Sequence, residues 1–281
     1  MQKAQFTILV LILFFNCIEG LAQDTILYKQ IDTTQLYLEL RYPENMDTTK
    51  QYPAVVFFFG GGWVGGSRSH FEHHADYFAK RGLVCFLADY RTAKGHGTTP
   101  FECLKDAKSA IRFIRAHASG FHIDPSKLIA AGGSAGGHLA VATALIEGYN
   151  EDQDDLGMSC TPNALMLFNP VFDNGPGGYG FERIGEQYKN FSPLHNIRKG
   201  APPTIVFFGT QDNLVPVETA EYFQVVMNKV GSRCELNLYE GQGHGFFNYG
   251  NFDFYKKTLL AADTFLQSLG YLNAEPVVVV E

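Results

Sequence analysis

The chain has 281 residues, which suits one large α/β domain or two small ones. It carries 22 lysines and arginines against 29 aspartates and glutamates, and the resulting net charge of −7 leaves no basic footprint for nucleic-acid binding. Hydrophobic residues make up 46% of the chain and include 24 phenylalanines, enough to build a sizeable core and to exclude a disordered chain.

The first 22 residues have the layout of a secretory signal peptide. Lys3 precedes an apolar run over 6–15, small residues follow, and cleavage is expected after Ala22. The run is too short to span a bilayer, so we expect export to the periplasm or beyond without stable membrane insertion. A lipoprotein with Cys17 as the lipid-bearing residue is the alternative, but the preceding LFFN is a poor lipobox.

The remaining residues, 23–281, alternate between strand-like and helix-like patterns and show no linker. Short apolar runs predict eight strands, at 25–31, 35–41, 54–59, 83–89, 128–131, 164–168, 204–208 and 234–239. Helical spacing predicts helices at 71–81, 101–119, 137–147, 217–230 and 253–269. The first two strands alternate in polarity like an edge hairpin, and the later ones read as parallel strands buried on both faces. We expect one domain with a mostly parallel sheet flanked by helices.

Four cysteines follow the signal segment: Cys85, Cys103, Cys160 and Cys234. An oxidising compartment would allow three complete pairings of these four. Two of the cysteines fall inside predicted strands, where a free thiol packs as a small hydrophobe. No C-x-x-C spacing is present to indicate a zinc knuckle or a redox motif. We therefore assign no disulfide.

The stretch GGSAG over 132–136 fits G-x-S-x-G, the nucleophile elbow. Ser134 falls just after the fifth predicted strand and just before a predicted helix, which is the context that this motif requires. Glycines flank such a serine because the chain doubles back tightly on both sides. The alternative is a glycine-rich turn that closes an ordinary crossover, and the strand–turn–helix context disfavours it.

A serine hydroxyl needs a base beside it and a third group to orient that base. Asp212 lies in a short loop after the seventh strand, and a turn or helix-capping role is its alternative. His244 lies between two glycines after the last strand, where a histidine side chain can reach the serine instead of packing in the core. The order Ser134, Asp212, His244 is the one expected in this fold.

Three successive glycines, 60–62, follow the third strand. Such a run lets backbone N–H groups approach a substrate closely and hold developing negative charge. A phosphate-binding loop is the alternative, but no Lys-Ser or Lys-Thr follows in the Walker spacing.

With these motifs the chain resembles the α/β-hydrolase superfamily, and within it the bacterial acetyl esterases and carboxylesterases near the hormone-sensitive lipase group. The resemblance runs from about 35 to 270 and is carried by FFFGGGW, ADYR, DAKSAIRFIR, GGSAGGHLA, GTQDNLVP and GHGFF. It implies an eight-stranded α/β-hydrolase fold with a small cap. It also implies oxyanion donors at Gly61, Gly62 and Ala135.

The chain departs from many of these relatives at one position, where Phe59 replaces a histidine before the glycines. That position supports the loop in the family, so we expect altered packing rather than lost catalysis. The resemblance further implies an internal ion pair between Arg91 and Asp106, with a structural role.

Two polar clusters offer other interpretations. His70 and His74 are four residues apart and can share a helix face, but H-E-x-x-H is absent and we predict no metal site. The acidic run 151–155 is predicted to be a solvated loop, because it lacks EF-hand spacing for calcium.

The segment 171–197 is too long for an ordinary connection and is predicted to form a cap over Ser134. Its aromatic side chains either line a substrate pocket or pack the cap down. Bulky rings beside the catalytic motifs should also narrow the pocket. The predicted pocket residues are Trp63, Phe172, Tyr179, Tyr188 and Phe247.

These features together predict an exported serine carboxylesterase that acts on short-chain, acetyl-type esters without metal or organic cofactor. An acylated glycan is the substrate suggested by family analogy, and the oligomeric state stays open. One alternative is a serine peptidase of the prolyl-oligopeptidase kind, although no propeller-like repeats are present. A catalytically silent binding protein on the same fold is the other.

Overall fold

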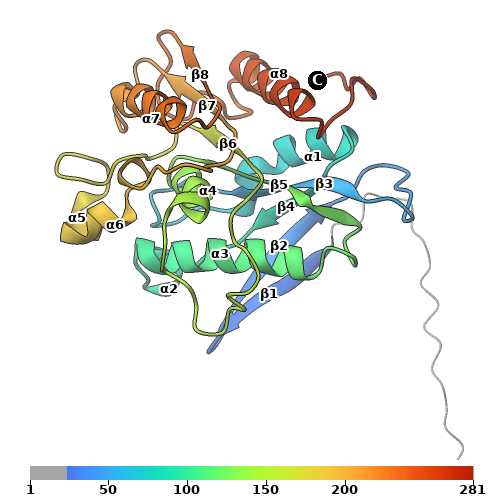
Figure 1. The fold of residues 1–281 in the computed structure, drawn as a ribbon, viewed down its shortest axis with the longest axis horizontal. Helices are drawn as coiled ribbons and strands as arrows, with labels where there is room; N and C mark the ends of the chain where they lie inside the picture. Colours follow the sequence, from blue (N-terminus) through green and yellow to red (C-terminus); the bar gives the residue numbers. More distant parts are fainter. Residues whose placement is uncertain (1–23, 281) are drawn as a thin grey trace, which may run out of the picture.

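The computed structural model describes residues 24–280, so the predicted signal peptide and Cys17 lie outside the described residues. Within them a single sheet has the order β1-β2-β4-β3-β5-β6-β7-β8 (Figure 1). The strands are β1 (Thr25–Ile31), β2 (Thr34–Arg41), β3 (Tyr52–Phe58), β4 (Val84–Ala88), β5 (Ile123–Gly133), β6 (Ala164–Phe168), β7 (Thr204–Gly209) and β8 (Cys234–Tyr239).

The sheet is mixed but mostly parallel, as predicted. β1 and β2 form an antiparallel hairpin at one edge, and β2 pairs antiparallel with β4. The remaining pairs, from β4 through β3 to β8, are all parallel. Strands β4, β6 and β7 are buried along their whole length, which explains their continuously apolar sequences.

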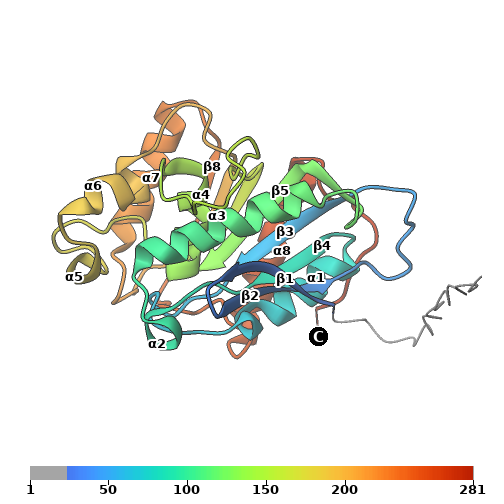
Figure 2. The same cartoon turned by 90° about the horizontal axis from the view of Figure 1, so that it is seen from below.

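Helices cover both faces of the sheet (Figures 1 and 2). The helices are η1 (Arg68–Phe71), α1 (Glu72–Lys80), α2 (Ala93–His96), α3 (Pro100–Ala116), α4 (Ala135–Leu145), α5 (Phe181–Ile184), η2 (Gly185–Gln187), α6 (Tyr188–Phe191), η3 (Pro193–His195), α7 (Val217–Lys229) and α8 (Phe252–Ser268). One apolar cluster joins one face of the sheet to α1 and α8, and a second joins the other face to α3, α4 and α7.

The largest boundary error concerns β5, which begins at Ile123 rather than at 128. The four residues after Ile123 are Asp124, Pro125, Ser126 and Lys127, so this part lacks the apolar pattern of a buried strand. The pairing with β3 is irregular in this part, between Tyr52 and Ala54. Only the second half of the strand, which leads to Ser134, carries the sequence signal.

The predicted cap segment, 171–197, connects β6 to β7 and contains α5, η2, α6 and η3. None of these one-turn elements has a sequence long enough to show a helical period. Both views place α5 and α6 outside the layered core, beside α4 and α7 (Figures 1 and 2).

Asp106 is fully buried in α3 and anchors an ion-pair cluster. Its carboxylate accepts hydrogen bonds from Arg91 Nη2 at 2.8 Å and from Lys29 Nζ at 2.7 Å, so the implied Arg91–Asp106 pair is confirmed. The acidic run is not simply a solvated loop, because Glu151 pairs with Arg91 and Asp154 with the buried Arg112. A charge removed from such a cluster would leave its partners uncompensated.

All four cysteines of the described residues are free, and Cys85, Cys103 and Cys234 are buried. None of the helices between residues 24 and 280 is long and apolar enough to cross a membrane.

His74 lies in α1 and is 1% exposed, and neither ring nitrogen has a hydrogen-bond partner. Aromatic rings surround it, among them Phe168 and Tyr255 with ring centroids at 5.3 and 4.8 Å. Burial, with smaller repulsion from His70 and His73, lowers the pKa of His74 to about 3. The neutral ring is therefore the native form over the whole physiological range.

This burial should make the fold sensitive to acid. Below an ordinary pKa of about 6.5 the unfolded chain gains a proton at His74 that the native state does not, so stability falls as the pH drops toward 3. His74→Phe should remove this contribution and raise the free energy of unfolding at pH 5, relative to wild type, by about 2 kcal/mol more than at pH 8. Denaturant titrations at the two pH values measure it, and an equal difference at both would contradict it.

Candidate active site

Ser134 occupies a strained turn between β5 and α4, with φ 54° and ψ −121°. Gly132 and Gly136, two residues to either side of it, must be glycine because backbone passes directly beside them. A Cβ on Gly132 would lie 2.4 Å from the backbone of Gly136, and one on Gly136 would lie 2.1 Å from the carbonyl oxygen of Phe58. The turn therefore holds the serine at the carboxyl end of the parallel strands, where sites of such sheets assemble.

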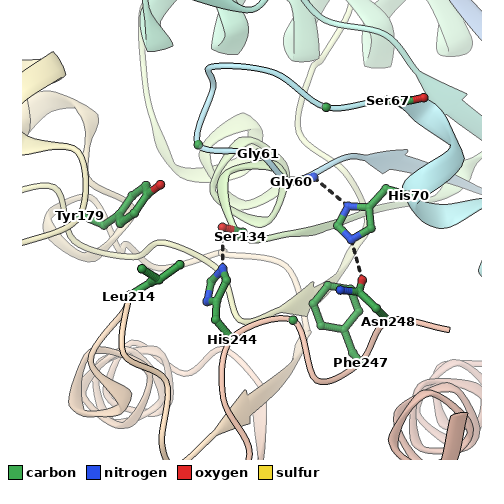
Figure 3. A pocket seen from close by; sticks show the side chains of 13 residues that line it. Gly60, Gly61, Ser67, His70, Ser134, Tyr179, Leu214, His244, Phe247 and Asn248 are labelled. Atoms are coloured by element: carbon green, nitrogen blue, oxygen red, sulfur yellow. Dashed lines mark hydrogen bonds between the residues drawn. The ribbon is translucent and has the colours of Figure 1, made fainter. Parts of the chain in front are cut away.

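Ser134, His244 and Asp212 form one hydrogen-bonded chain, and Figure 3 shows its link from Ser134 to His244. The Ser134 Oγ lies 2.9 Å from His244 Nε2, and His244 Nδ1 lies 2.7 Å from Asp212 Oδ2. With Nδ1 donating to the carboxylate, Nε2 is left to accept the hydroxyl proton. This is the arrangement of a serine nucleophile with its general base.

Asp212 uses its two oxygens differently. Oδ1 accepts from the N–H groups of Leu214 and Val215, at 2.9 and 3.0 Å, so it also makes the turn proposed as its alternative role. Oδ2 faces His244. Burial by itself raises the pKa of Asp212, but the hydrogen bonds from His244, Val215 and Asn169 outweigh it and hold the pKa below its ordinary value. The carboxylate is thus charged and able to stabilise an imidazolium.

Asn169, at the end of β6, is a site residue that the sequence analysis missed. It is fully buried, and its Nδ2 donates to Asp212 Oδ2 at 3.0 Å while lying 3.0 Å from His244 Nδ1. The signal available was a polar residue directly after a buried parallel strand, the position that Ser134 also takes relative to β5. Asn169 fixes the carboxylate against which His244 rests.

The glycine loop after β3 adopts backbone angles that a side chain would strain, with φ 123° at Gly61 and 62° at Gly62. A Cβ at Gly61 would also meet the oxygen of Gly65 at 2.0 Å. Within residues 24–280 the N–H groups of Gly61, Gly62 and Ala135 donate to no protein acceptor. Ala135 begins α4, so its free N–H also lies at the positive end of that helix. These groups are available as oxyanion donors.

Contacts outside the loop hold it in place. Phe59, the departure from the family pattern, stacks on Tyr90 with ring centroids 4.0 Å apart, and Tyr90 donates to the Phe59 carbonyl at 2.7 Å. The cap contributes Arg183, which donates to the carbonyl of Gly62 and lies over the ring of Tyr179 at 5.3 Å. The loop is thereby tied both to the core and to the cap.

Ser134 opens into a pocket of about 290 Å³. Of the five predicted pocket residues, Tyr179 and Phe247 line it, together with Leu214 and His70 (Figure 3). In this view Tyr179 and Leu214 lie on the opposite side of Ser134 from His70.

Three of the predicted pocket residues do not line this pocket. Trp63 is 1% exposed and packs edge-on against His138, and Phe172 is fully buried and stacks on Phe223. Tyr188 lies in the cap with its ring edge-on to His195. A place beside the glycine loop, as for Trp63, or in the segment 171–197, as for the other two, does not determine which way a ring points. These rings fill the core or that segment instead.

His70 and Asn248 also enter the pocket wall and were not predicted there. His70 Nδ1 accepts from the N–H of Gly60 at 2.9 Å, and Nε2 lies 2.7 Å from Asn248 Oδ1. Both ring nitrogens are thus occupied. No group of three or more histidine, cysteine, aspartate or glutamate side chains in the described part of the chain is arranged to hold a metal ion.

Two family models match consecutive parts of the chain. BD-FAE matches residues 38–169, and the dienelactone hydrolase family matches residues 175–272. The first covers the glycine loop and Ser134, and the second covers Asp212 and His244.

Individual relatives are esterases. Esterase LipC of Mycobacterium tuberculosis is 32% identical over 221 residues, which cover 70% of this chain and 54% of that protein. Acetylxylan esterase of Xylanibacter ruminicola is 28% identical over 224 residues, covering 74% of this chain and 43% of that one. The chain thus spans about half the length of these relatives.

Solved structures give a nearly full-length match. Native esterase 2 of Thermogutta terrifontis superposes with a TM-score of 0.86 at 42% identity, covering 91% of this chain and 95% of that one. The same enzyme has been solved phosphorylated by paraoxon and with propionate or butyrate bound. The predicted fold is thereby confirmed, and this chain belongs to the α/β-hydrolase esterases.

Proposed function

We propose that the protein is a serine carboxylesterase whose catalytic residues are Ser134, His244 and Asp212. The observation that carries this proposal is their unbroken hydrogen-bonded chain, which ends at a pocket beside three free backbone N–H groups. Each group required for acyl transfer is present and already oriented.

In the first half of the reaction Ser134 Oγ attacks the ester carbonyl carbon while His244 Nε2 takes the hydroxyl proton. The C=O electron pair moves onto oxygen, and the N–H groups of Gly61, Gly62 and Ala135 hold the resulting oxyanion. Collapse of this intermediate breaks the C–O bond to the alcohol, which leaves with the proton from His244. The acyl group is then bonded to Ser134.

The second half repeats these steps with water. His244 takes a proton from water, the hydroxide attacks the acyl carbon, and the same N–H groups hold the second oxyanion. Ser134 recovers its proton from His244 as the acid departs. Asp212 remains ionised throughout, in keeping with its lowered pKa, and stabilises the charged imidazole.

The size of the pocket favours a small acyl group. A volume of about 290 Å³ lies at the lower end of the range for small-molecule sites. Phe247 forms part of its wall and is itself packed on Phe168 and Phe71, so it has little freedom to move aside. The propionate- and butyrate-bound structures of the Thermogutta esterase support the same preference.

We propose that the substrate is an acetylated glycan, whose sugar hydroxyl is the alcohol half of the ester. The relationship to an acetylxylan esterase supports this substrate, as does the export that the first 22 residues predict. Release of acetate from acetylated xylan oligosaccharides, compared with the unacetylated oligomers, tests the proposal. Hydrolysis of nitrophenyl acetate without acetate release from any acetylated glycan would contradict the glycan but not the esterase.

Removal of either the nucleophile or the base should abolish turnover. Ser134→Ala cannot form the acyl-enzyme, and His244→Ala cannot activate the serine, so each should lower kcat on nitrophenyl acetate by about 10⁴-fold or more. Unfolding midpoints should stay close to that of wild type. Retention of more than about a tenth of the activity in either variant would refute the assignment.

Acyl-chain length should show a sharp limit. We expect the fastest turnover on acetyl to butyryl esters and little at eight carbons or beyond, because a longer chain must displace packed aromatic rings. No rate increase is expected when the substrate forms an emulsion. A nitrophenyl ester series measured below and above the solubility limit tests both points, and a matched peptide amide tests the peptidase alternative. A maximum at long chains, or faster amide than ester cleavage, would overturn this reading.

A further inference from the structure

His70 connects two loops of the active site that are far apart in sequence. On one side its Nδ1 accepts a hydrogen bond from the N–H of Gly60, which opens the glycine loop. On the other side its Nε2 lies 2.7 Å from Oδ1 of Asn248, four residues after His244 (Figure 3). One side chain therefore connects the start of the glycine loop to the loop of the catalytic base.

The hydrogen-bond partners fix the form of the ring. A backbone N–H can only donate, so Nδ1 of His70 must be an unprotonated acceptor and Nε2 must carry the hydrogen. That hydrogen is then donated to the amide oxygen of Asn248. Burial is the main cause that lowers the pKa of His70, which keeps this neutral form populated.

Asn248 is in turn held against the turn that contains His244. Its N–H donates to the carbonyl of Gly245 at 3.1 Å, and a Cβ on Gly245 would lie only 2.9 Å from Asn248 Nδ2. A shift of Asn248 is therefore transmitted to the residue adjoining the catalytic base.

We propose that His70 is a positioning residue. Through its hydrogen bonds to Gly60 and Asn248 it holds the glycine loop at a fixed distance from the His244 loop. Tyr90 and Arg183 also hold this loop, but their bonds join it to the core and to the segment 171–197, whereas the bonds of His70 join it to the His244 loop. A misplacement of about 1 Å is enough to cost 100-fold in rate. The proposal rests on the esterase function proposed above.

Packing alone is the competing explanation for His70. Its ring contacts Phe71 and Phe247, with centroids at 4.7 and 5.6 Å. Two substitutions separate the roles: His70→Phe keeps a ring but has no acceptor, and His70→Asn loses the ring but offers Oδ1 near the position of Nδ1.

Steady-state kinetics on nitrophenyl acetate provide the test. His70→Phe should lower kcat by about 100-fold and His70→Asn by only about tenfold, with KM changed less than about twofold in both. A transition-state analogue such as a trifluoromethyl ketone should lose affinity in proportion to kcat/KM, because its oxyanion uses the same donors. A His70→Phe variant more active than His70→Asn would overturn the proposal in favour of packing.

A second set of variants removes the hydrogen bond between His70 and Asn248 from the Asn248 side. Asn248→Ala should also cost about tenfold in kcat, and the double variant H70N/N248A should cost no more than either single one, because all three break the same bond. Asn251→Ala, in the exposed part of the same loop, is the matched control and should behave like wild type. Losses that multiply in the double variant would contradict a bridge. A wild-type protein inactive on every ester would instead refute the esterase proposal.

Discussion

The close approach of two backbone segments places the nucleophile of this active site beside the glycine loop. The turn that carries Ser134 packs against the end of β3 so tightly that a Cβ on Gly136 would lie within 2.3 Å of the carbonyl oxygens of both Phe58 and Phe59. This contact brings the start of α4 beside the glycine loop. The nucleophile and the N–H groups proposed to hold the oxyanion are thus positioned by the same backbone contact, without a side chain between them.

The other half of the site depends on polar groups at the ends of neighbouring strands. Asn169 follows β6, Asp212 follows β7 and His244 follows β8, so the parallel order of these strands brings the three together. Each is tied to another, and the carboxylate of Asp212 is satisfied on both oxygens. Breaking the contacts to Asp212 would leave a fully buried carboxylate unpaired at a cost, so these contacts hold the three side chains in one arrangement.

The sequence predicts the fold and the Ser134–Asp212–His244 order well because each residue lies in the turn or loop that follows a recognisable strand. Residues that act through distant partners escape such reasoning. In the sequence His70 shows only as part of a histidine-rich helix pattern. The fold places it between Gly60 and Asn248, which are distant in the chain. Aromatic residues are misjudged for a related reason: Phe172 lies in the predicted cap segment, but its ring stacks on Phe223 in the core.

Covalent trapping tests the central claim most directly, because it identifies the atom that attacks. The protein should be treated with paraoxon, which phosphorylates the related Thermogutta esterase, and digested for peptide mass spectrometry. One diethyl phosphate group per chain on Ser134, with loss of esterase activity in proportion to labelling and no labelling of Ser134→Ala, is the predicted result. Labelling at another residue, or full activity in a completely labelled protein, would contradict the account.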